Sequence, residues 1–310
     1  MLIEQLWVSI MGQLENMQLF VKVVELGSIT KTANQLNIAK SAVSRRLTEL
    51  EAKLGVKLIQ RTTRKSNLTE AGELYLHKCH YLIDEIEALN NQLSSTQKNL
   101  SGHLKIAIPL SFGIMHLIPA IDAFLKKYTL LKIDIHFSDR KVDIIEEGFD
   151  LAFRIGILED SSFNARKITQ IRHSICASPD YLTHHGQPEN ISELKQHKLL
   201  KYSDIPNAGF NLISPDGKNH VVNMEASHRS NNGDFLKYMA LSGHGITLLP
   251  TFITGEQIKS GELINILPTH KIATMHAYAL YPNRQYLPQK VRILIDFLIE
   301  KFGDTPYWDN

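Results

Sequence analysis

The sequence predicts a multidomain protein with an all-α winged helix-turn-helix first, a long dimerisation helix next, and an α/β domain last. Three observations support this order. Residues 28–72 have the pattern of two short helices followed by a basic hairpin. Residues 75–93 carry apolar side chains at helical spacing, and from His103 onward short apolar strands alternate with helices.

A helix-turn-helix is predicted within residues 28–54. In the first helix, over 28–37, Ala33 and Leu36 share an apolar face and Thr30 is the expected N-cap. Asn37 and Ile38 form the turn. The second helix runs over about 41–54, and four apolar residues predict its buried stripe: Val43, Leu47, Leu50 and Leu54.

The opposite face of the second helix carries short polar or cationic side chains near its start. They are Lys40, Ser41, Ser44, Arg45 and Thr48. A helix that enters the major groove of DNA needs such a face, because hydroxyls and a guanidinium bond to base edges and no bulky side chain blocks the approach.

Charge is concentrated in the same part of the chain. Residues 40–65 hold eight basic and two acidic residues, a net charge of +6, while the whole chain carries +2. A local excess of this kind indicates a surface that faces phosphates. Arg61 and Arg64, at the tip of the predicted hairpin of 56–60 and 65–68, are expected to enter a minor groove or clamp phosphates.

A third helix is predicted over residues 17–26, with Gly27 at its end. Residues 1–15 are interpreted as an N-terminal extension, and Met11 and Met17 remain open as alternative starts. The segment has no basic region before its apolar residues, so no signal peptide is predicted. No apolar span is long enough for a membrane helix, and a cytoplasmic protein without a membrane partner is expected.

The long helix begins after Thr69 and Gly72. Six residues recur along it at spacings of four and three: Tyr75, Cys79, Leu82, Ile86, Leu89 and Leu93. A second copy of the same helix is the simplest partner for this stripe, which predicts a homodimer; packing against the chain's own C-terminal domain is the alternative. A polar hinge is expected over residues 90–102.

Beyond the hinge, strands are predicted over 104–109, 132–138 and 150–156, with helices over 112–128 and 141–148 between them. This alternation predicts a parallel sheet. Residues 166–179 form one further strand. A helix over 287–302 closes the fold, and the tail from Gly303 is expected to be frayed.

Ligands of open α/β sheets bind where the strands end. Here those ends are residues 109–111, 138–139 and 154–156, which offer a hydroxyl, backbone N–H groups and a guanidinium. An acidic or polar small molecule fits such groups.

No catalytic centre and no cofactor are predicted. The sequence has no GxSxG, HExxH, P-loop or GxGxxG motif. Its two cysteines, Cys79 and Cys176, lie far apart and indicate no disulfide framework. His77, Cys79 and His80 are close enough to suggest a metal, but Cys79 already belongs to the apolar stripe, so no metal site is predicted.

The run AVSRRLTELEAKLGVKLIQRTTRKSNLTEAG, preceded by FVKVVELGSITKTANQLNIAKS, closely resembles the N-terminal region of LysR-type transcriptional regulators. GHLKIAIPLSFG, FDLAFRIGILEDSSFNARKI and GHGITLLP resemble the effector domain of that family. The resemblance implies a two-lobed domain similar to periplasmic binding proteins. The implied bounds are 16–73 for the DNA-binding domain, 74–100 for the linker helix and hinge, and 101–310 for the effector domain. Within it, lobe I covers about 101–177 and 271–302, and lobe II about 178–270.

The resemblance also implies roles for single residues. Lys40, Ser41, Ser44 and Arg45 match groove-facing positions, and Arg64 matches the wing arginine that meets the minor groove. Ser41 and Ala42 stand where the family often has a proline. By the same resemblance the effector cleft is lined by Ser111, Phe112, Ser138, Arg154, Tyr202 and Asn232.

The implied function is a DNA-binding transcriptional regulator controlled by a small-molecule co-inducer. Its expected partners are double-stranded DNA with a dyad-symmetric operator, further copies of the chain in a homodimer or homotetramer, and RNA polymerase. A solute-binding receptor, or a small α/β enzyme with a helical appendage, is the main alternative. A structural dimer-forming scaffold is a third, but it leaves the basic cluster without a role.

Overall fold

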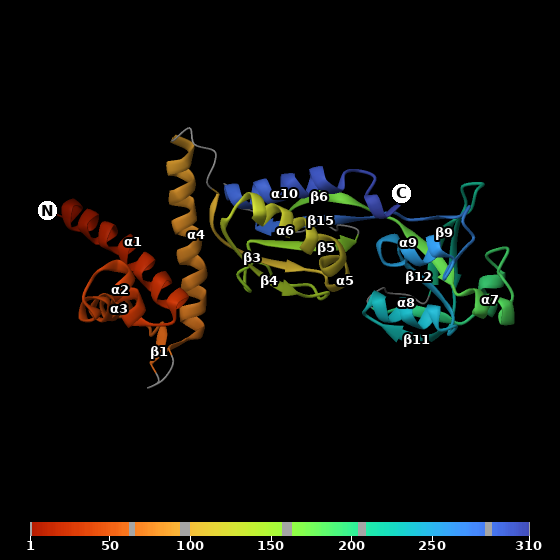
Figure 1. Ribbon diagram of the computed structural model, residues 1–310, viewed down its shortest axis with the longest axis horizontal. Coiled ribbons are helices and arrows are strands. Elements are labelled where there is room, and N and C mark those ends of the chain that lie inside the picture. Colours follow the sequence, from red (N-terminus) through yellow and green to blue (C-terminus); the bar gives the residue numbers. More distant parts are fainter. Residues whose placement is uncertain are drawn as a thin grey trace. The chain divides into compact units, whose positions relative to one another are not determined.

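The computed structural model describes residues 2–61, 66–93, 100–156, 163–203, 209–282 and 287–309. It divides into two compact units, Met1–His103 and Leu104–Asn310 (Figure 1). No helix within the described residues is long and apolar enough to cross a membrane.

The first unit is built on three helices and a hairpin. Helix α1 spans Leu2–Leu26, α2 spans Ile29–Leu36 and α3 spans Lys40–Leu54. The N-cap of α2 is Ser28, whose Oγ accepts from the Lys31 N–H, so the expected cap at Thr30 is wrong by two residues. Asn37 makes the turn with a φ of 52°, a left-handed conformation that asparagine tolerates better than most residues.

Helix α1 does not begin at residue 17, and residues 2–15 of the predicted N-terminal extension are helical. The helix continues back to Leu2 because nothing in that segment stops it: it has no proline, and its one glycine, Gly12, is tolerated. The added turns also contact α3. Lys53 Nζ donates to Gln13 Oε1 at 2.9 Å, and Arg46 lies 3.6 Å from Glu15.

A single apolar core joins these helices. Val43, Leu47 and Leu50 of α3 are buried, which confirms the predicted stripe, and Leu54 packs against it from a partly buried position. Phe20 of α1 lies at the centre of the core and is fully buried. Burying an aliphatic side chain contributes about 1.5–3 kcal/mol, so this stripe fixes which face of α3 points inward.

The hairpin pairs β1 (Ile59–Arg61) with β2 (Ser66–Leu68) in antiparallel register. Glu51 of α3 holds it in place. Its Oε1 accepts from the N–H groups of Leu58 at 3.0 Å and Ile59 at 3.2 Å, while its Oε2 meets Lys57 Nζ at 2.6 Å. Burial raises the pKa of the Glu51 carboxyl, but the bonds from Lys57, Ile59 and Leu58 outweigh it and leave the pKa below its usual value.

Helix α4 (Glu70–Leu93) follows, capped by Thr69, whose Oγ1 accepts from the Gly72 N–H at 2.9 Å. A Cβ at Gly72 would lie 2.0 Å from the Leu58 carbonyl oxygen, so only glycine allows this approach to the hairpin. Tyr75 and Cys79 pack into the unit's own core, so the predicted dimer stripe is partly internal. Leu82 and Ile86 remain exposed. Residues 94–99 of the expected hinge lie outside the described residues.

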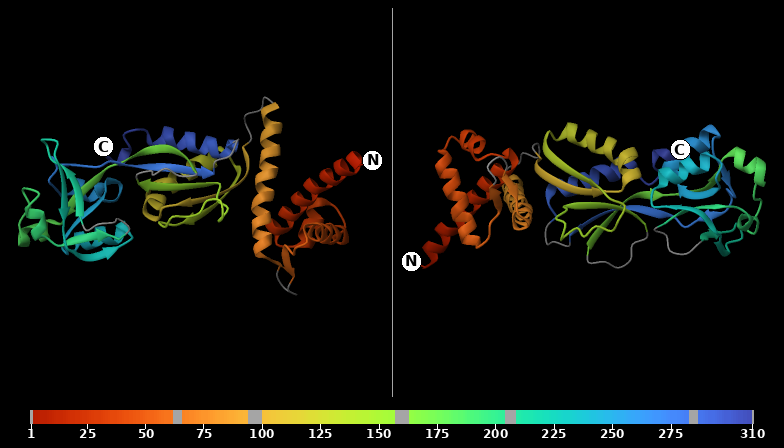
Figure 2. Two further views of the ribbon diagram at one scale, coloured as in Figure 1. Left: turned by 180° about the vertical axis from the view of Figure 1, so that it is seen from behind. Right: turned by 90° about the horizontal axis from the view of Figure 1, so that it is seen from below.

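The second unit has two lobes. Lobe I holds the sheet β4-β3-β5-β15-β6, made of β3 (Ser101–Ile108), β4 (Leu130–Phe137), β5 (Leu151–Gly156), β6 (Phe163–Ile171) and β15 (Met275–Pro282). Helices α6 (Ile118–Lys127) and α10 (Gln289–Phe302) pack together on one face of this sheet (Figures 1 and 2). A short helix α5 (Leu110–Phe112) and a π-helical turn (Gly113–Leu117) lead from β3 into α6.

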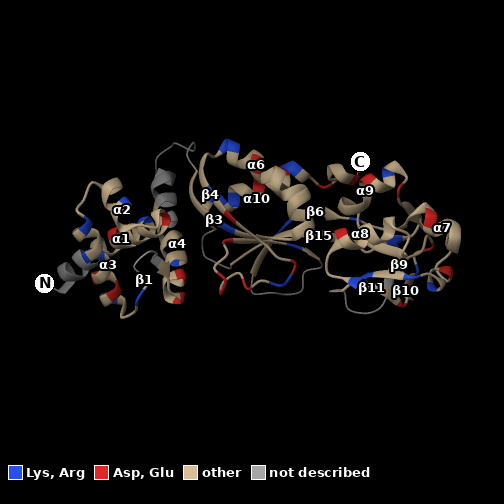
Figure 3. Cartoon of the chain, turned by 60° about the horizontal axis from the view of Figure 1, so that its bottom comes forward, with Lys and Arg blue, Asp and Glu red and all other residues tan. Residues whose placement is uncertain are grey.

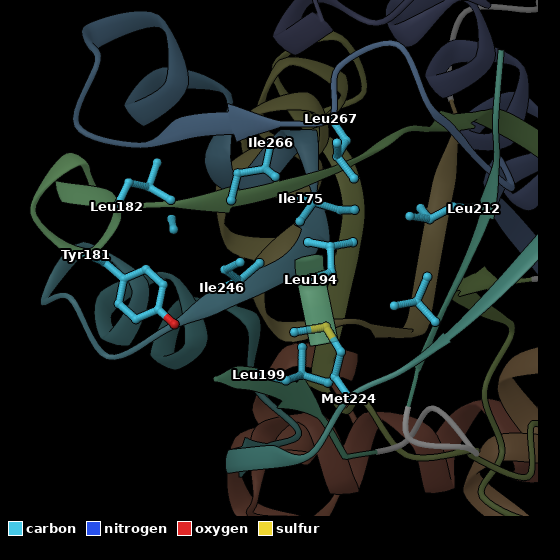
Figure 4. Close-up of a cluster of buried hydrophobic side chains, with 12 residues drawn as sticks. Ile175, Tyr181, Leu182, Leu194, Leu199, Leu212, Met224, Ile246, Ile266 and Leu267 are labelled. Atoms are coloured by element: carbon cyan, nitrogen blue, oxygen red, sulfur yellow. The ribbon is translucent and has the colours of Figure 1, made fainter. Parts of the chain in front are cut away.

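Lobe II holds the sheet β11-β8-β12-β7-β13, made of β7 (His173–Ala177), β8 (Leu199–Tyr202), β11 (Ala226–Ser230), β12 (Ile246–Pro250) and β13 (Ile264–Ile266). A small sheet of β9 (Gly209–Ile213), β10 (Asn219–Asn223) and β14 (Lys271–Ile272) lies beside it. The helices are α7 (Pro179–His185), α8 (Gly233–Leu241), α9 (Thr251–Ser260) and the 3₁₀ turn Glu193–Gln196. Tyr181 and Ile246 lie in its buried core, shown in Figure 4.

The chain leaves lobe I at Arg172, between β6 and β7, rather than near residue 177. The predicted strand over 166–179 is therefore two strands in different sheets, since β7 pairs with β12 and β13. The chain returns as β15, which runs antiparallel to β5 and β6. Each lobe thus has a mixed sheet. In lobe I, β3 and β5 are parallel and the returning β15 is antiparallel to β5. In lobe II, β8 is parallel to β11 and β12, while β7 is antiparallel to β12.

Two local expectations are wrong. Residues 141–148 form turns and not a helix, since Asp143 Oδ1 accepts from the N–H groups of Ile145 and Glu146 and offers the backbone an alternative to helical bonds. The C-terminal tail is not frayed: a 3₁₀ turn over Tyr307–Asp309 buries Trp308 against Phe112 and Phe252. The expected architecture of winged helix-turn-helix, long helix and two-lobed α/β domain is confirmed.

The Glu51 contacts predict a stability effect. Glu51→Ala leaves two buried N–H groups unpaired, so we expect a loss of at least about 1–3 kcal/mol in unfolding free energy at pH 7. Because the folded-state pKa is lowered, the stabilisation exists above the ordinary Glu pKa of about 4.3 and is lost as the pH falls through the folded-state value. Denaturant titrations of the wild type and the variant from pH 7 to pH 3 should show a constant difference that begins to shrink only below about pH 4.3. Glu49→Ala, an exposed neighbour, should stay within about 0.5 kcal/mol, and an equal loss in both variants would contradict the assignment.

Candidate nucleic-acid interface

The outward face of α3 is a shallow, open hollow of about 450 Å³ lined by Ser41, Ser44, Arg45, Thr48, Glu49 and Ala52. Four of the six lining side chains, those of Ser41, Ser44, Thr48 and Ala52, are short and end in a hydroxyl or methyl group. Four of the predicted contact residues, Ser41, Ser44, Arg45 and Thr48, lie together here. The fifth on α3, Lys40, is exposed at the first position of the helix.

Some polar atoms of this face already interact with other residues of α3. Thr48 Oγ1 donates to the Ser44 carbonyl at 3.0 Å, so the hydroxyl offers lone pairs and its methyl group outward but has no proton left to donate. Arg45 Nε lies 3.6 Å from Glu49 Oε1, and their side chains are 74% and 60% exposed. An ion pair this exposed contributes little to stability.

The neighbouring Arg46 has a different position. It is 40% exposed and lies 3.6 Å from Glu15 of α1, so it belongs to the contact between α1 and α3. Arg64 lies outside the described residues, and β1 ends at Arg61, whose side chain is not described. Figure 3 shows that basic and acidic residues both lie along α3.

In the second unit, Ser111 and the first turn of α8 are joined across the two lobes. Ser111 Oγ donates to Asp234 Oδ2 at 2.6 Å, and Lys237 lies 3.3 Å from the other oxygen of Asp234. Asn232, another predicted effector residue, is the N-cap of α8, and its Oδ1 accepts from the Phe235 N–H at 2.9 Å. The hydroxyl expected to face a ligand is therefore bonded to a carboxylate of the opposite lobe.

Arg154 lies at the same edge of lobe I as Ser111. Strands β3 and β5 pair in parallel, with Ala107 opposite Ala152, so the ends that carry Ser111 and Arg154 point the same way. Burial lowers the pKa of the half-buried Arg154 guanidinium. It has no hydrogen bond or ion pair to another residue that the structure describes, and a desolvated cation in that state favours an anionic partner.

Of the remaining predicted effector residues, two lie at strand ends and one is buried in an aromatic cluster. The Ser138 N–H donates to the Ile108 carbonyl at 2.9 Å, which fixes the end of β4 against β3. Tyr202 ends β8 and pairs with Ser230, whose Oγ accepts from the Asn232 N–H at 3.1 Å. Phe112 is 1% exposed, with its ring centroid 5.1 Å from that of Phe252. Its ring thus supports α5 and is not open to a ligand.

The groups that carry nucleophilic chemistry are poorly placed for it. Burial raises the pKa of both the Cys79 and the Cys176 thiols to about 12, so neither is a thiolate near neutral pH. In the exposed turn after β9, Ser214 donates to Asp216, and His220 Nε2 lies 3.0 Å from the same hydroxyl oxygen. Asp216 and the Lys218 carbonyl both lie within hydrogen-bond distance of the Ser214 hydroxyl, so its one proton has acceptors other than His220.

No three His, Cys, Asp or Glu side chains within the described parts of the chain gather as metal ligands. Sequence reasoning missed two polar residues at the sites. Glu49 lies one helical turn after Arg45, and the helical spacing was a signal that could have found it. Asp234 lies two residues after Asn232, but its contact with Ser111 joins distant parts of the chain and has no local signal.

Comparison with known proteins agrees with this geometry. Residues 14–73 match the bacterial regulatory helix-turn-helix protein of the lysR family, and residues 97–303 match the LysR substrate binding domain. An uncharacterised HTH-type transcriptional regulator of Haemophilus influenzae is 37% identical over 281 residues, covering 91% of this chain and 98% of the relative.

Two further relatives match over nearly their whole length. The HTH-type transcriptional activator AaeR of Escherichia coli K12 is 33% identical, with 95% of this chain and 96% of the relative covered. The structure of CrgA, a LysR-type transcriptional regulator from Neisseria meningitidis, superposes with a TM-score of 0.61 at 31% identity, covering 94% of this chain and 99% of that one. The chain therefore belongs to the LysR family of transcriptional regulators.

Proposed function

We propose that this regulator reads duplex DNA with the outward face of α3. The residues proposed to contact the major groove are Lys40, Ser41, Ser44, Arg45 and Thr48. Arg61 and Arg64 are proposed to contact the flanking phosphate backbone or the minor groove. The observation that carries the proposal is the hollow on α3, in which small hydroxyls surround one exposed arginine. Helices presented in this way fit the major groove, where arginine bonds guanine O6 and N7. The DNA-binding domain proposed for this role spans residues 16–73, preceded by the extension 1–15.

The proposed effector is a small molecule with a carboxylate or similar anionic group. Arg154 supplies a desolvated cation, and the acceptor that now bonds to Ser111 is itself a carboxylate, that of Asp234. An anionic effector would take the place of Asp234 and break a bond between the lobes. Its binding energy would then shift the relation of the lobes, which is the coupling that a regulator needs. Ser138, Tyr202 and Asn232 complete the proposed site, and Phe112 holds α5 behind it.

A homodimer is proposed through the exposed part of α4, within a linker of residues 74–100. Leu82 and Ile86 are 41% and 39% exposed and lie one turn apart, so an apolar strip faces outward. Two copies would bring two α3 helices to a dyad-symmetric operator. Association of dimers into tetramers and contact with RNA polymerase are further parts of the proposal.

The proposal includes no catalytic role and no cofactor. Its support is that the relatives are regulators and that the nucleophilic groups described above are buried or misdirected. Because a regulator acts where chromosomal DNA lies, the proposed location is the cytoplasm. The proposed effector domain covers 101–310, with its lobes divided at Arg172 and near residue 273.

The DNA-reading face predicts a difference between two adjacent arginines. Arg45→Ala should weaken binding to a specific operator by about 1–3 kcal/mol, because it removes a base contact. Arg46→Ala is the matched control, since Arg46 is turned toward Glu15 of α1. Fluorescence anisotropy with a labelled duplex at fixed salt measures both, and equal affinities for the two variants would count against the assignment of this face.

The α4 strip predicts a change in assembly. A lysine at both exposed positions, Leu82→Lys with Ile86→Lys, should convert dimers to monomers at micromolar concentration, because two charges would be buried at the interface. Leu74→Lys is the control, because Leu74 is 57% exposed but lies off the strip. Light scattering after size exclusion gives the mass, and an unchanged mass for the double variant would exclude this helix as the interface.

The effector site predicts ligand-dependent stabilisation that needs Arg154. In thermal-shift measurements on the full chain with a panel of small organic acids, at least one acid should raise the melting temperature; a ligand at a hundred times its Kd adds about 2.7 kcal/mol. The same acid should give no shift with Arg154→Met. Stabilisation by neutral compounds alone, or an undiminished shift in the variant, would refute the anionic assignment.

A further inference from the structure

Glu49 is an acidic side chain on a surface that the proposed function brings against a polyanion. It lines the hollow with Ser41, Ser44, Arg45 and Thr48, and its side chain is 60% exposed. A carboxylate at this place repels phosphates. It is compatible with tight binding only where it meets a hydrogen-bond donor on the duplex.

The fold does not need this carboxylate. Its only described contact is the 3.6 Å ion pair with Arg45, and exposed pairs on a helix surface add little stability. Glu51, two residues later, has the opposite character: it is buried and bonds to three donors of the hairpin. Of these two acidic residues, Glu51 therefore stabilises the fold, and Glu49 does not.

The geometry leaves both partners of the pair able to bond further. The pair joins Arg45 Nε to Glu49 Oε1 at 3.6 Å, and the described residues form no other ion pair or hydrogen bond with this guanidinium, so its two terminal nitrogens can act as a fork. The second oxygen of Glu49 is likewise available as an acceptor. In the major groove the fork matches guanine O6 and N7, while a carboxylate accepts from the N4 amino group of cytosine.

The spacing of Arg45 and Glu49 along α3 allows their side chains to contact neighbouring base pairs. Four residues advance a helix by about 6 Å, and base pairs stack at about 3.4 Å. Arg45 and Glu49 thus reach base pairs within about two steps of each other.

We propose that Glu49 is a specificity-determining residue that reads a cytosine N4 amino group in the major groove, next to a guanine read by Arg45. The inference rests on the proposed DNA-reading role of α3. On this proposal, Glu49 increases the discrimination between base pairs and lowers the overall affinity for DNA. A base pair without a hydrogen-bond donor at that point leaves the carboxylate unpaired, which weakens binding to that sequence.

The test is selection of preferred sites from a randomised duplex pool, with the full-length protein and variants at one salt concentration, followed by anisotropy titrations on the selected duplexes. The wild type should select a cytosine at one position of each half-site. Glu49→Gln should lose that cytosine and favour adenine there, because an amide bonds adenine N6 and N7. Glu49→Ala should show no preference at that position, while preferences elsewhere persist. Discrimination at that position should fall at least fivefold.

Glu15→Gln is the matched control. Glu15 is 64% exposed and pairs with an arginine of α3 at the same distance of 3.6 Å, but it lies on α1 and does not line the hollow. It should select the wild-type site. The inference is overturned if Glu49→Gln keeps the cytosine, or if it tightens binding to every duplex equally, since the carboxylate would then only repel phosphates. A wild-type protein that binds duplexes without any preferred site would overturn the proposed function itself.

Discussion

The buried stripe of α3 fixes which side chains this helix turns to solvent. Val43, Leu47 and Leu50 are at most 2% exposed, and they fix the rotation of the helix about its axis. Once that rotation is fixed, helical geometry sends Ser41, Ser44, Arg45 and Thr48 to the other side. A rotation of α3 that moved these groups inward would expose the stripe and bury a guanidinium, both of which cost free energy. The packing that stabilises the first unit therefore also turns the polar face of α3 toward solvent.

In the second unit, side-chain packing likewise fixes the position of polar groups at the proposed effector site. The C-terminal turn buries Trp308 between Phe112 of lobe I and Phe252 of lobe II, and Asp309 lies 3.7 Å from Arg172 at the crossing between the lobes. These contacts hold α5 close to the first turn of α8, where Ser111 meets Asp234. Aromatic packing from the end of the chain thus supports the Ser111–Asp234 bond, the one that the proposed anionic effector would replace.

The sequence predicted the parts of the fold that have a local, repeating signal. The α3 stripe and the alternation of strands and helices follow periodicities of 3.6 and 2, and the structure has them. The extent of α1 was missed although Ile3, Trp7, Ile10 and Leu14 recur at helical spacing, a local signal that predicts a helix. The contacts of this segment with Lys53 and Arg46 join residues far apart in sequence and have no local signal. The division of residues 166–179 between two sheets depends on strand pairing, which a single apolar run does not encode.

The sites show the same division. The predicted α3 contacts lie together because they are neighbours on one helix. The predicted effector residues come from both lobes, and tertiary packing brings Ser111 of lobe I to the first turn of α8, which Asn232 caps. Phe112 shows the limit of residue-by-residue transfer from a family pattern, since it is buried in an aromatic cluster. Asp234 was not predicted, because its partner Ser111 lies 123 residues away along the chain.

Methylation interference tests the central claim most directly, because it probes which groove the protein needs. Methyl groups on guanine N7 lie in the major groove and those on adenine N3 in the minor groove. If α3 rests in the major groove, N7 methylation of guanines within each half-site should remove those duplexes from the bound fraction. A bound fraction that retains N7-methylated guanines throughout the half-sites would contradict the account.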